Sequence, residues 1–213
     1  MATPNISIRL EVLPGETVAE QITRAADFGF DAIALPGRFL DRWLAELREC
    51  RADVPLPMAS ISLGFVHSLL SPNESDRQEC RDSLLRLLDL CAELEAPRLN
   101  VPPCLIQDNP VRIREVGDYR SLSERLDAIL LEELPAIGDA AAERGVTFLL
   151  EPVNKYESEY LNSVVHAARL IRRLDHPAVQ VTADFFHMQL EELHTAAALQ
   201  ESVSEVGHVH VAD

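Results

Sequence analysis

The chain has 213 residues, of which 47% are hydrophobic and 25% are charged, a composition that can fill one large globular core. Its 35 acidic residues outnumber 19 basic ones, and the net charge of −16 argues against binding to nucleic acid phosphates or anionic membranes. No apolar stretch reaches the ~20 residues that cross a bilayer, and the first residues lack the basic and apolar segments of a signal peptide, so we expect a cytoplasmic protein.

Short apolar segments alternate along the chain with longer amphipathic segments. The predicted elements, in chain order, are a strand at 6–10, a helix at 15–28, a strand at 29–35, a helix at 39–51, a strand at 58–63, a helix at 74–94, a strand at 97–102, a helix at 122–144, a strand at 146–151, a helix at 161–174, a strand at 179–183, a helix at 191–206 and a strand at 208–212. The polar stretch 103–119 is expected to be a loop over the mouth of the fold. Pro135 should kink its helix or divide it in two.

This alternation predicts a parallel sheet in an α/β fold, with no linker that would divide the chain into two domains. Two architectures fit, an open doubly wound sheet and a closed (β/α)8 TIM barrel. A glycine-rich phosphate loop after the first strand would favour the open sheet, but residues 13–16 form a plain turn. We therefore predict one TIM barrel domain over residues 1–213. The barrel is incomplete, because seven strands are present and the eighth βα unit of a barrel of about 250 residues is missing.

Three predicted strands in the last third of the chain each carry, at or near their end, a side chain of a type that can bind a metal. The three side chains are those of Glu151, Asp184 and His210. The carboxyl ends of barrel strands surround the active site, and side chains two residues apart on a strand share a face. We therefore expect the three side chains to converge as ligands of a divalent metal. Two carboxylates and an imidazole suit Mn²⁺, Mg²⁺, Co²⁺ or Zn²⁺. The alternative is that each caps a helix or forms an ion pair.

Three more histidines lie near these strand ends. His187 follows Asp184 by three residues and is interpreted as a hydrogen-bond donor to a substrate, with a supporting contact or a surface position left open. His67 lies on the loop after the third strand and is a candidate for lining the same pocket. His208 lies one layer deeper than His210 and is interpreted as a histidine of the barrel interior rather than a second ligand.

Three segments resemble the sugar phosphate isomerase/epimerase family, the xylose isomerase-like barrels that include ketose 3-epimerases, hydroxypyruvate isomerases and inosose dehydratases. They are Glu151-Pro-Val-Asn-Lys-Tyr-Glu157, Asp184-Phe-Phe-His187-Met-Gln-Leu-Glu191 and His208-Val-His210-Val-Ala-Asp213. The resemblance covers the whole chain and is strongest from Val146 onward. It indicates the family rather than the substrate.

The resemblance implies a metal-dependent isomerase or epimerase that acts on a small sugar or sugar phosphate through an enediolate. It implies that Glu151, Asp184 and His210 bind the metal and that Glu151 also transfers a proton. Glu157 and His187 would then hydrogen-bond the oxygens of the sugar. Mn²⁺ is the expected cofactor, with Co²⁺, Mg²⁺ and Zn²⁺ left open. The expected binding partner is a small sugar substrate. We expect no binding to nucleic acid or to a membrane, and a homodimer is left open.

The family has a fourth ligand, a glutamate on an eighth strand, which this chain lacks. The chain therefore resembles a family member truncated at its C-terminus, and a remnant without catalytic activity is one alternative. Another is an abasic-site endonuclease-like phosphodiesterase, which is built on a related barrel. It would need a basic DNA-binding face, and Lys155 is the only lysine of the chain.

Overall fold

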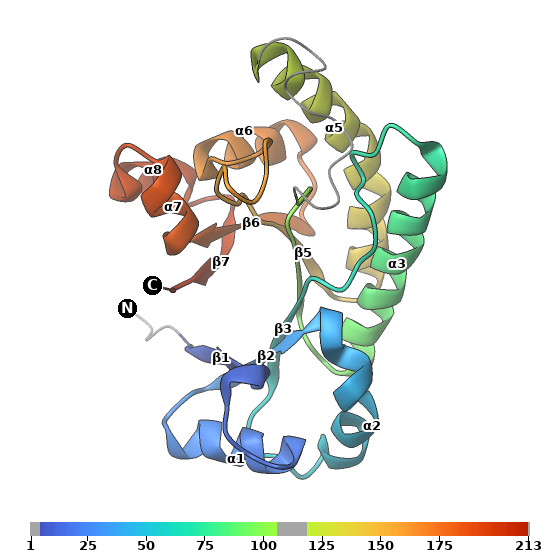
Figure 1. The fold of residues 1–213 in the computed structure, drawn as a ribbon, viewed down its shortest axis with the longest axis vertical. Coiled ribbons are helices and arrows are strands. Elements are labelled where there is room, and N and C mark those ends of the chain that lie inside the picture. Colours follow the sequence, from blue (N-terminus) through green and yellow to red (C-terminus); the bar gives the residue numbers. More distant parts are fainter. Residues whose placement is uncertain (1–4, 106–118, 213) are drawn as a thin grey trace.

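The computed structural model of this protein describes residues 5–105 and 119–212. Its centre is one sheet of seven parallel strands in the order β1-β2-β3-β4-β5-β6-β7, so each strand lies beside its neighbour in the sequence. The strands curve around a common axis and the helices cover the outside (Figure 1). This is an incomplete (β/α)8 barrel, which confirms the architecture predicted from the alternation of elements.

The strands fall close to their predicted positions. They are β1 (Ser7–Arg9), β2 (Ala32–Pro36), β3 (Met58–Ser62), β4 (Arg98–Val101), β5 (Thr147–Leu150), β6 (Val179–Asp184) and β7 (Val206–His210). The last strand was expected at 208–212 and begins two residues earlier. Its start is set by the neighbouring strand, because Val206 pairs with Val181 in the sheet.

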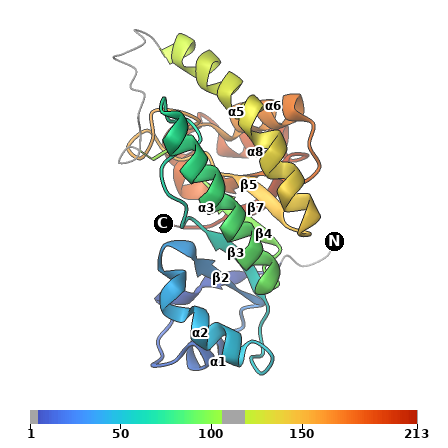
Figure 2. The same ribbon diagram turned by 90° about the vertical axis from the view of Figure 1, so that its right-hand side faces the viewer.

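Helices follow most of the strands and pack on the outside of the barrel. They are α1 (Val18–Asp27), α2 (Leu40–Cys50), α3 (Glu74–Glu93), α5 (Tyr119–Glu143), α6 (Val164–Leu174), α7 (Phe185–Glu191) and α8 (Thr195–Ser202), with short 3-10 helices η1 (Leu10–Val12) and η2 (Gly37–Phe39). Figure 2 shows α3 and α5 side by side, and the two helices contact each other.

Two helix predictions differ from the structure. The helix expected at 191–206 is replaced by α7 and α8, because Asp184 caps a helix that starts directly after β6. The chain then leaves the helical conformation at Glu192 and His194. Pro135 was expected to kink or divide the fourth predicted helix, and the division does not occur, since α5 continues through this proline. Leu134 and Ile137 on either side of this proline are both buried, which holds the two halves of α5 against the core.

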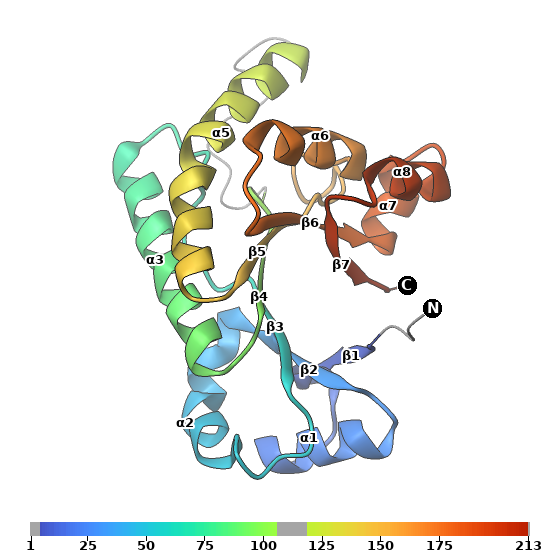
Figure 3. The ribbon, with the colours of Figure 1, turned by 180° about the vertical axis from the view of Figure 1, so that it is seen from behind.

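Part of the predicted loop at 103–119 lies outside the described residues, which stop at 105 and resume at 119. Among the described residues, β1 and β7 form the two edges of the sheet. Figure 3 shows them facing each other across the opening. The barrel is therefore open between β7 and β1. No helix in the described part of the chain is long and apolar enough to cross a membrane.

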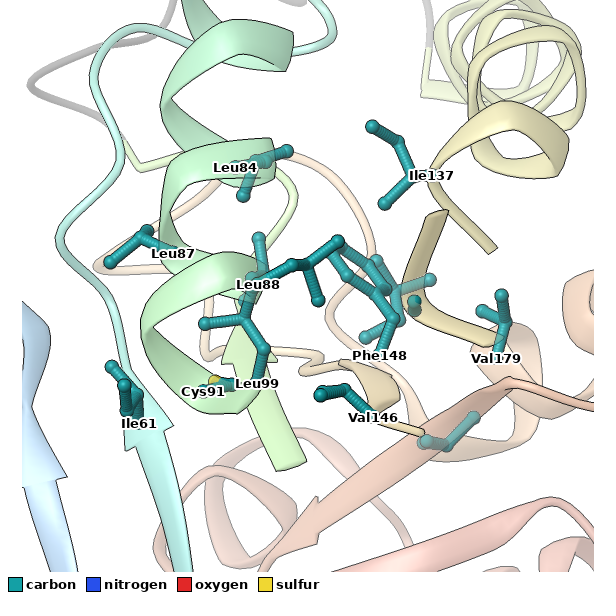
Figure 4. Packing of buried hydrophobic residues seen from close by; sticks show 14 of the residues in the cluster. Ile61, Leu84, Leu87, Leu88, Cys91, Leu99, Ile137, Val146, Phe148 and Val179 are labelled. Carbon is teal, nitrogen blue, oxygen red and sulfur yellow. The ribbon is translucent and has the colours of Figure 1, made fainter. Parts of the chain in front are cut away.

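The main hydrophobic core lies between the outer face of the sheet and the helices. Figure 4 shows Phe148 of β5 at its centre, with Leu88 of α3 and Ile137 of α5 around it. Phe148 is fully buried and pairs with Leu99 of β4 in the sheet. Because side chains alternate between the two faces of a strand, Leu149 points to the inside of the barrel, and Glu151 follows on that same side.

Candidate functional site

The carboxyl ends of β5, β6 and β7 bring three polar side chains together. Glu151 is the residue after β5, whereas Asp184 and His210 end β6 and β7 and pair with each other in the sheet. Nδ1 of His210 lies 2.8 Å from Oε1 of Glu151 and 3.4 Å from Oδ2 of Asp184. The convergence expected from the positions of these residues on their strands is therefore present.

The charges in this cluster stabilise one another. Burial disfavours a charged imidazole at His210, but hydrogen bonds with Asp184 and Glu151 outweigh it and raise the pKa of His210 to about 9. Burial likewise acts to raise the pKa of Asp184, yet its hydrogen bond with His210 and the nearby ring of His187 bring that pKa below its ordinary value. At neutral pH the cluster thus holds an imidazolium against the ionised Asp184.

His208 differs from His210 although both are on β7. The two rings meet edge to face, with centroids 5.0 Å apart. Burial and the neighbouring charge of His210 lower the pKa of His208 to about 4, so the His208 ring is neutral at pH 7. A neutral, largely buried ring agrees with its interpretation as a histidine of the barrel interior.

Asp184 uses its two oxygens differently. Oδ1 accepts hydrogen bonds from the backbone N–H groups of Phe186, at 2.8 Å, and His187, at 3.2 Å, and so caps α7. Oδ2 faces His210. The helix-capping interpretation and the ligand interpretation of Asp184 are therefore compatible, because each concerns a different oxygen.

A buried amide that the sequence analysis did not identify supports Glu151. Asn100 of β4 is 1% exposed, and its Nδ2 donates to Oε2 of Glu151 at 2.7 Å. Its Oδ1 accepts a hydrogen bond from Oγ1 of Thr182 at 2.5 Å. The available signal was an asparagine between the apolar residues Leu99 and Val101 of a strand, because a buried amide requires partners.

Asn154 is the second residue that the sequence analysis missed. It is 2% exposed and its Nδ2 donates to Oε1 of Glu157 and lies near Nδ1 of His187, both at 2.8 Å. Glu157 and His187 are thus held side by side, with 3.8 Å between Oε1 and Nδ1. One ligand atom each from Glu151, Asp184 and His187 lies within 4.8 Å of the other two.

The structure brings five of the six candidate site residues into one region, namely Glu151, Asp184, His210, His187 and Glu157. His67 is placed differently. It lies on the loop after β3, where its Nε2 is 3.1 Å from Oε2 of Glu79 on α3, and its side chain is 45% exposed. Its proposed contact with a substrate stays a prediction.

The donor set fits a divalent cation. Two carboxylates at the ends of β5 and β6 face the same imidazole nitrogen, and the positive charge on His210 is what compensates them in this structure. A divalent cation would supply that compensation instead and take carboxylate oxygen and imidazole nitrogen as ligands.

A hollow of about 360 Å³ lies elsewhere, between α2 and α3, and its lining includes Arg38, Leu44 and Arg86 but no residue of the cluster.

Comparison with known proteins identifies relatives of the chain. It is 27% identical to 3-dehydro-D-guloside 4-epimerase of Escherichia coli over 198 residues, which cover 93% of this chain and 75% of that protein. It is 30% identical to D-psicose 3-epimerase of Ruminiclostridium cellulolyticum over 204 residues, which cover 90% of this chain and 65% of that protein. The chain therefore spans 65–75% of the length of these two relatives.

Solved structures of sugar epimerases share the fold. The crystal structure of apo 3-keto-D-glucoside 4-epimerase from E. coli superposes with a TM-score of 0.83 at 24% identity, covering 99% of this chain and 80% of that one. D-psicose 3-epimerase crystallised with D-fructose superposes with a TM-score of 0.80 at 22% identity, covering 99% and 73%.

The profile of the xylose isomerase-like TIM barrel family matches residues 22–213, which is most of the chain. Relatives found by sequence include two sugar epimerases and a putative hydroxypyruvate isomerase, so the chain is that of an enzyme of this kind. This protein belongs to the xylose isomerase-like TIM barrel family.

Proposed function

We propose that this protein is a divalent-metal-dependent epimerase or isomerase of a small ketose or sugar phosphate, and that Glu151, Asp184 and His210 hold the metal. The observation that carries the proposal is the position of Nδ1 of His210 between the carboxylates of Glu151 and Asp184, at the ends of three neighbouring strands. Relatives that are epimerases of a 3-dehydroguloside and of D-psicose support a small carbohydrate substrate. Mn²⁺ is the metal we propose first, with Co²⁺, Mg²⁺ and Zn²⁺ as alternatives.

The reaction requires removal of a proton from the carbon beside a carbonyl group. A divalent cation in the cluster would supply positive charge that stabilises the enediolate formed from the sugar. Glu151 removes or returns the proton, since it is a buried carboxylate that follows β5 at the carboxyl ends of the strands. The hydrogen bond from Asn100 to Oε2 leaves Oε1 as the oxygen that faces the cluster.

His187 and Glu157 bind the sugar in this proposal. Glu157 lies on the loop after β5 and His187 lies at the start of α7, and Asn154 holds both side chains. Together they orient the hydroxyl and carbonyl oxygens of the sugar so that the reacting carbon faces Glu151. Misplacing one orienting group typically lowers the reaction rate about 10²-fold. His187→Ala should therefore lower turnover by about that factor.

The test is exchange of deuterium from solvent into a panel of ketoses and ketose phosphates by the full-length gene product, with Mn²⁺ or Co²⁺ supplied. Glu151→Gln should abolish exchange, because an amide cannot accept the proton. The matched control is Glu124→Gln, which removes an exposed carboxylate paired with Arg120 on α5 and should leave exchange unchanged.

Exchange at the original rate in Glu151→Gln would refute the assigned proton transfer. Exchange into none of the sugars, combined with cleavage of abasic DNA, would favour the endonuclease function instead. A protein that exchanges no substrate and binds no divalent cation would fit a remnant without activity.

A further inference from the structure

Asn154 is nearly inaccessible and all of its polar groups have partners. Oδ1 accepts a hydrogen bond from the backbone N–H of Tyr156 at 3.0 Å, and Nδ2 donates to Oε1 of Glu157 at 2.8 Å. Nδ2 also lies 2.8 Å from Nδ1 of His187, and the backbone N–H of Asn154 points to the same ring nitrogen at 3.3 Å. One residue therefore contacts both groups that the proposed function assigns to the sugar.

The orientation of the Asn154 amide is determined by these partners. The backbone N–H of Tyr156 can only donate, so it requires the amide oxygen. The carboxylate of Glu157 accepts, so it requires the amide NH₂ group. Exchanging the oxygen and nitrogen of the amide would lose both hydrogen bonds at once. The group that faces His187 is therefore an N–H donor.

This donor determines which nitrogen of His187 carries the proton. Two N–H groups of Asn154 point to Nδ1, so Nδ1 must present a lone pair and the proton of the neutral ring must be on Nε2. Rotating the ring by half a turn would place a C–H group against both donors. The hydrogen bonds thus select one tautomer and one ring orientation.

The tautomer decides what His187 can do at the site. A protonated Nε2 donates a hydrogen bond and has no lone pair for a metal. This matters because His187 is close enough to Glu151 and Asp184 to complete a metal-binding group with them. We propose that Asn154 is a positioning residue that holds His187 in the Nε2–H tautomer, which makes His187 a donor to a substrate oxygen and keeps it from binding the metal.

The inference rests on the proposed function for the identity of the metal and the sugar, but the tautomer itself can be measured without either. Long-range ¹H–¹⁵N correlation spectra of the metal-free, sugar-free protein at pH 8 distinguish a protonated ring nitrogen from an unprotonated one. The signals of His187 are assigned by their loss in His187→Gln. We expect Nδ1 to be unprotonated and Nε2 protonated. A ring with the proton on Nδ1, or on both nitrogens, would overturn the proposal.

Asn154→Asp is the informative variant, because a carboxylate accepts where the amide donated. The backbone N–H of residue 154 still faces Nδ1 at the longer distance of 3.3 Å, and we expect the carboxylate to outweigh it and move the proton of His187 to Nδ1. The freed lone pair on Nε2 should then tighten Mn²⁺ binding by about tenfold, the lower end of the range over which histidine partners alter metal affinity. The control is Asn162→Asp, which places the same charge on the same loop. Asn162 donates to the carbonyl oxygens of Val153 and Ser158 and not to His187.

A double variant separates the two explanations of any tightening. If His187 becomes a ligand in Asn154→Asp, the gain in affinity should disappear in Asn154→Asp combined with His187→Gln. If the gain persists there, or if Asn162→Asp shows it too, the effect is added negative charge and the proposal is wrong. An unchanged tautomer in Asn154→Asp would also overturn it. None of these readouts depends on turnover of a sugar, so failure of the proposed function would be seen separately.

Discussion

Binding of a divalent cation to this protein should weaken as the pH falls below about 9. The raised pKa of His210 means that both Nδ1 and Nε2 of this ring carry a proton over the whole neutral range, so neither nitrogen has a free lone pair. The metal must displace that proton, because only a neutral imidazole is a ligand. Asp184 adds no pH dependence in this range, since the hydrogen bond with His210 keeps its pKa below the ordinary value against the effect of burial.

The magnitude follows from the pKa of His210. Each pH unit below about 9 should cost about tenfold in apparent affinity, which is about 1.4 kcal/mol. At pH 7 the metal would bind about 50-fold more weakly than at pH 9, where half of the His210 rings are still protonated. The metal-free protein should behave in the opposite way. A pKa raised above the ordinary 6.5 contributes stability that is fully present below pH 6.5 and is lost as the pH rises through 9.

Isothermal titration calorimetry with Mn²⁺ between pH 7 and 9, in buffers of different ionisation enthalpy, gives both the affinity and the number of protons released. We expect about one proton per metal ion at pH 7. His208→Gln is the control, because the pKa of about 4 keeps that ring neutral throughout, and its pH slope should match the unchanged protein. An affinity independent of pH from 7 to 9, with no proton release, would refute the role of His210 as a ligand that exchanges a proton for a metal.

Three substitutions test other parts of the structure. Asn100→Leu removes the hydrogen bond to Oε2 of Glu151 and should weaken Mn²⁺ binding about tenfold or more in the same calorimetry, while an unchanged affinity would show that Asn100 does not orient Glu151. Phe148→Ala empties the fully buried centre of the core and should cost about 3–5 kcal/mol in urea unfolding; a loss below about 1 kcal/mol would contradict the packing. Gly37→Ala should destabilise by about 1–3 kcal/mol, since its Cβ would lie 2.2 Å from the backbone oxygen of Leu63, and a neutral effect would mean that the ends of β2 and β3 are further apart.

Local sequence patterns were enough to predict the architecture and the three strand-end residues. Alternating apolar strands and amphipathic helices leave few arrangements other than a parallel α/β sheet. The period of two along a strand then places Glu151 on the inner face of the barrel. These inferences need only residues that are close in the sequence, which is why they agree with the structure, whereas the start of β7 depended on its pairing with β6.

The contacts that support the site were decided by tertiary structure. Asn100 and Glu151 are 51 residues apart, and Asn100 and Thr182 are 82 apart, so no local period relates them. They meet because the curvature and register of the sheet bring β4, β5 and β6 around one interior. In the same way, the sequence predicted His210 as a metal ligand and His187 as a donor to the substrate, but local spacing alone does not decide between these two roles. That choice depends on which hydrogen-bond donors and acceptors reach each ring, and only the folded chain brings Asn154 to His187 and Asp184 to His210.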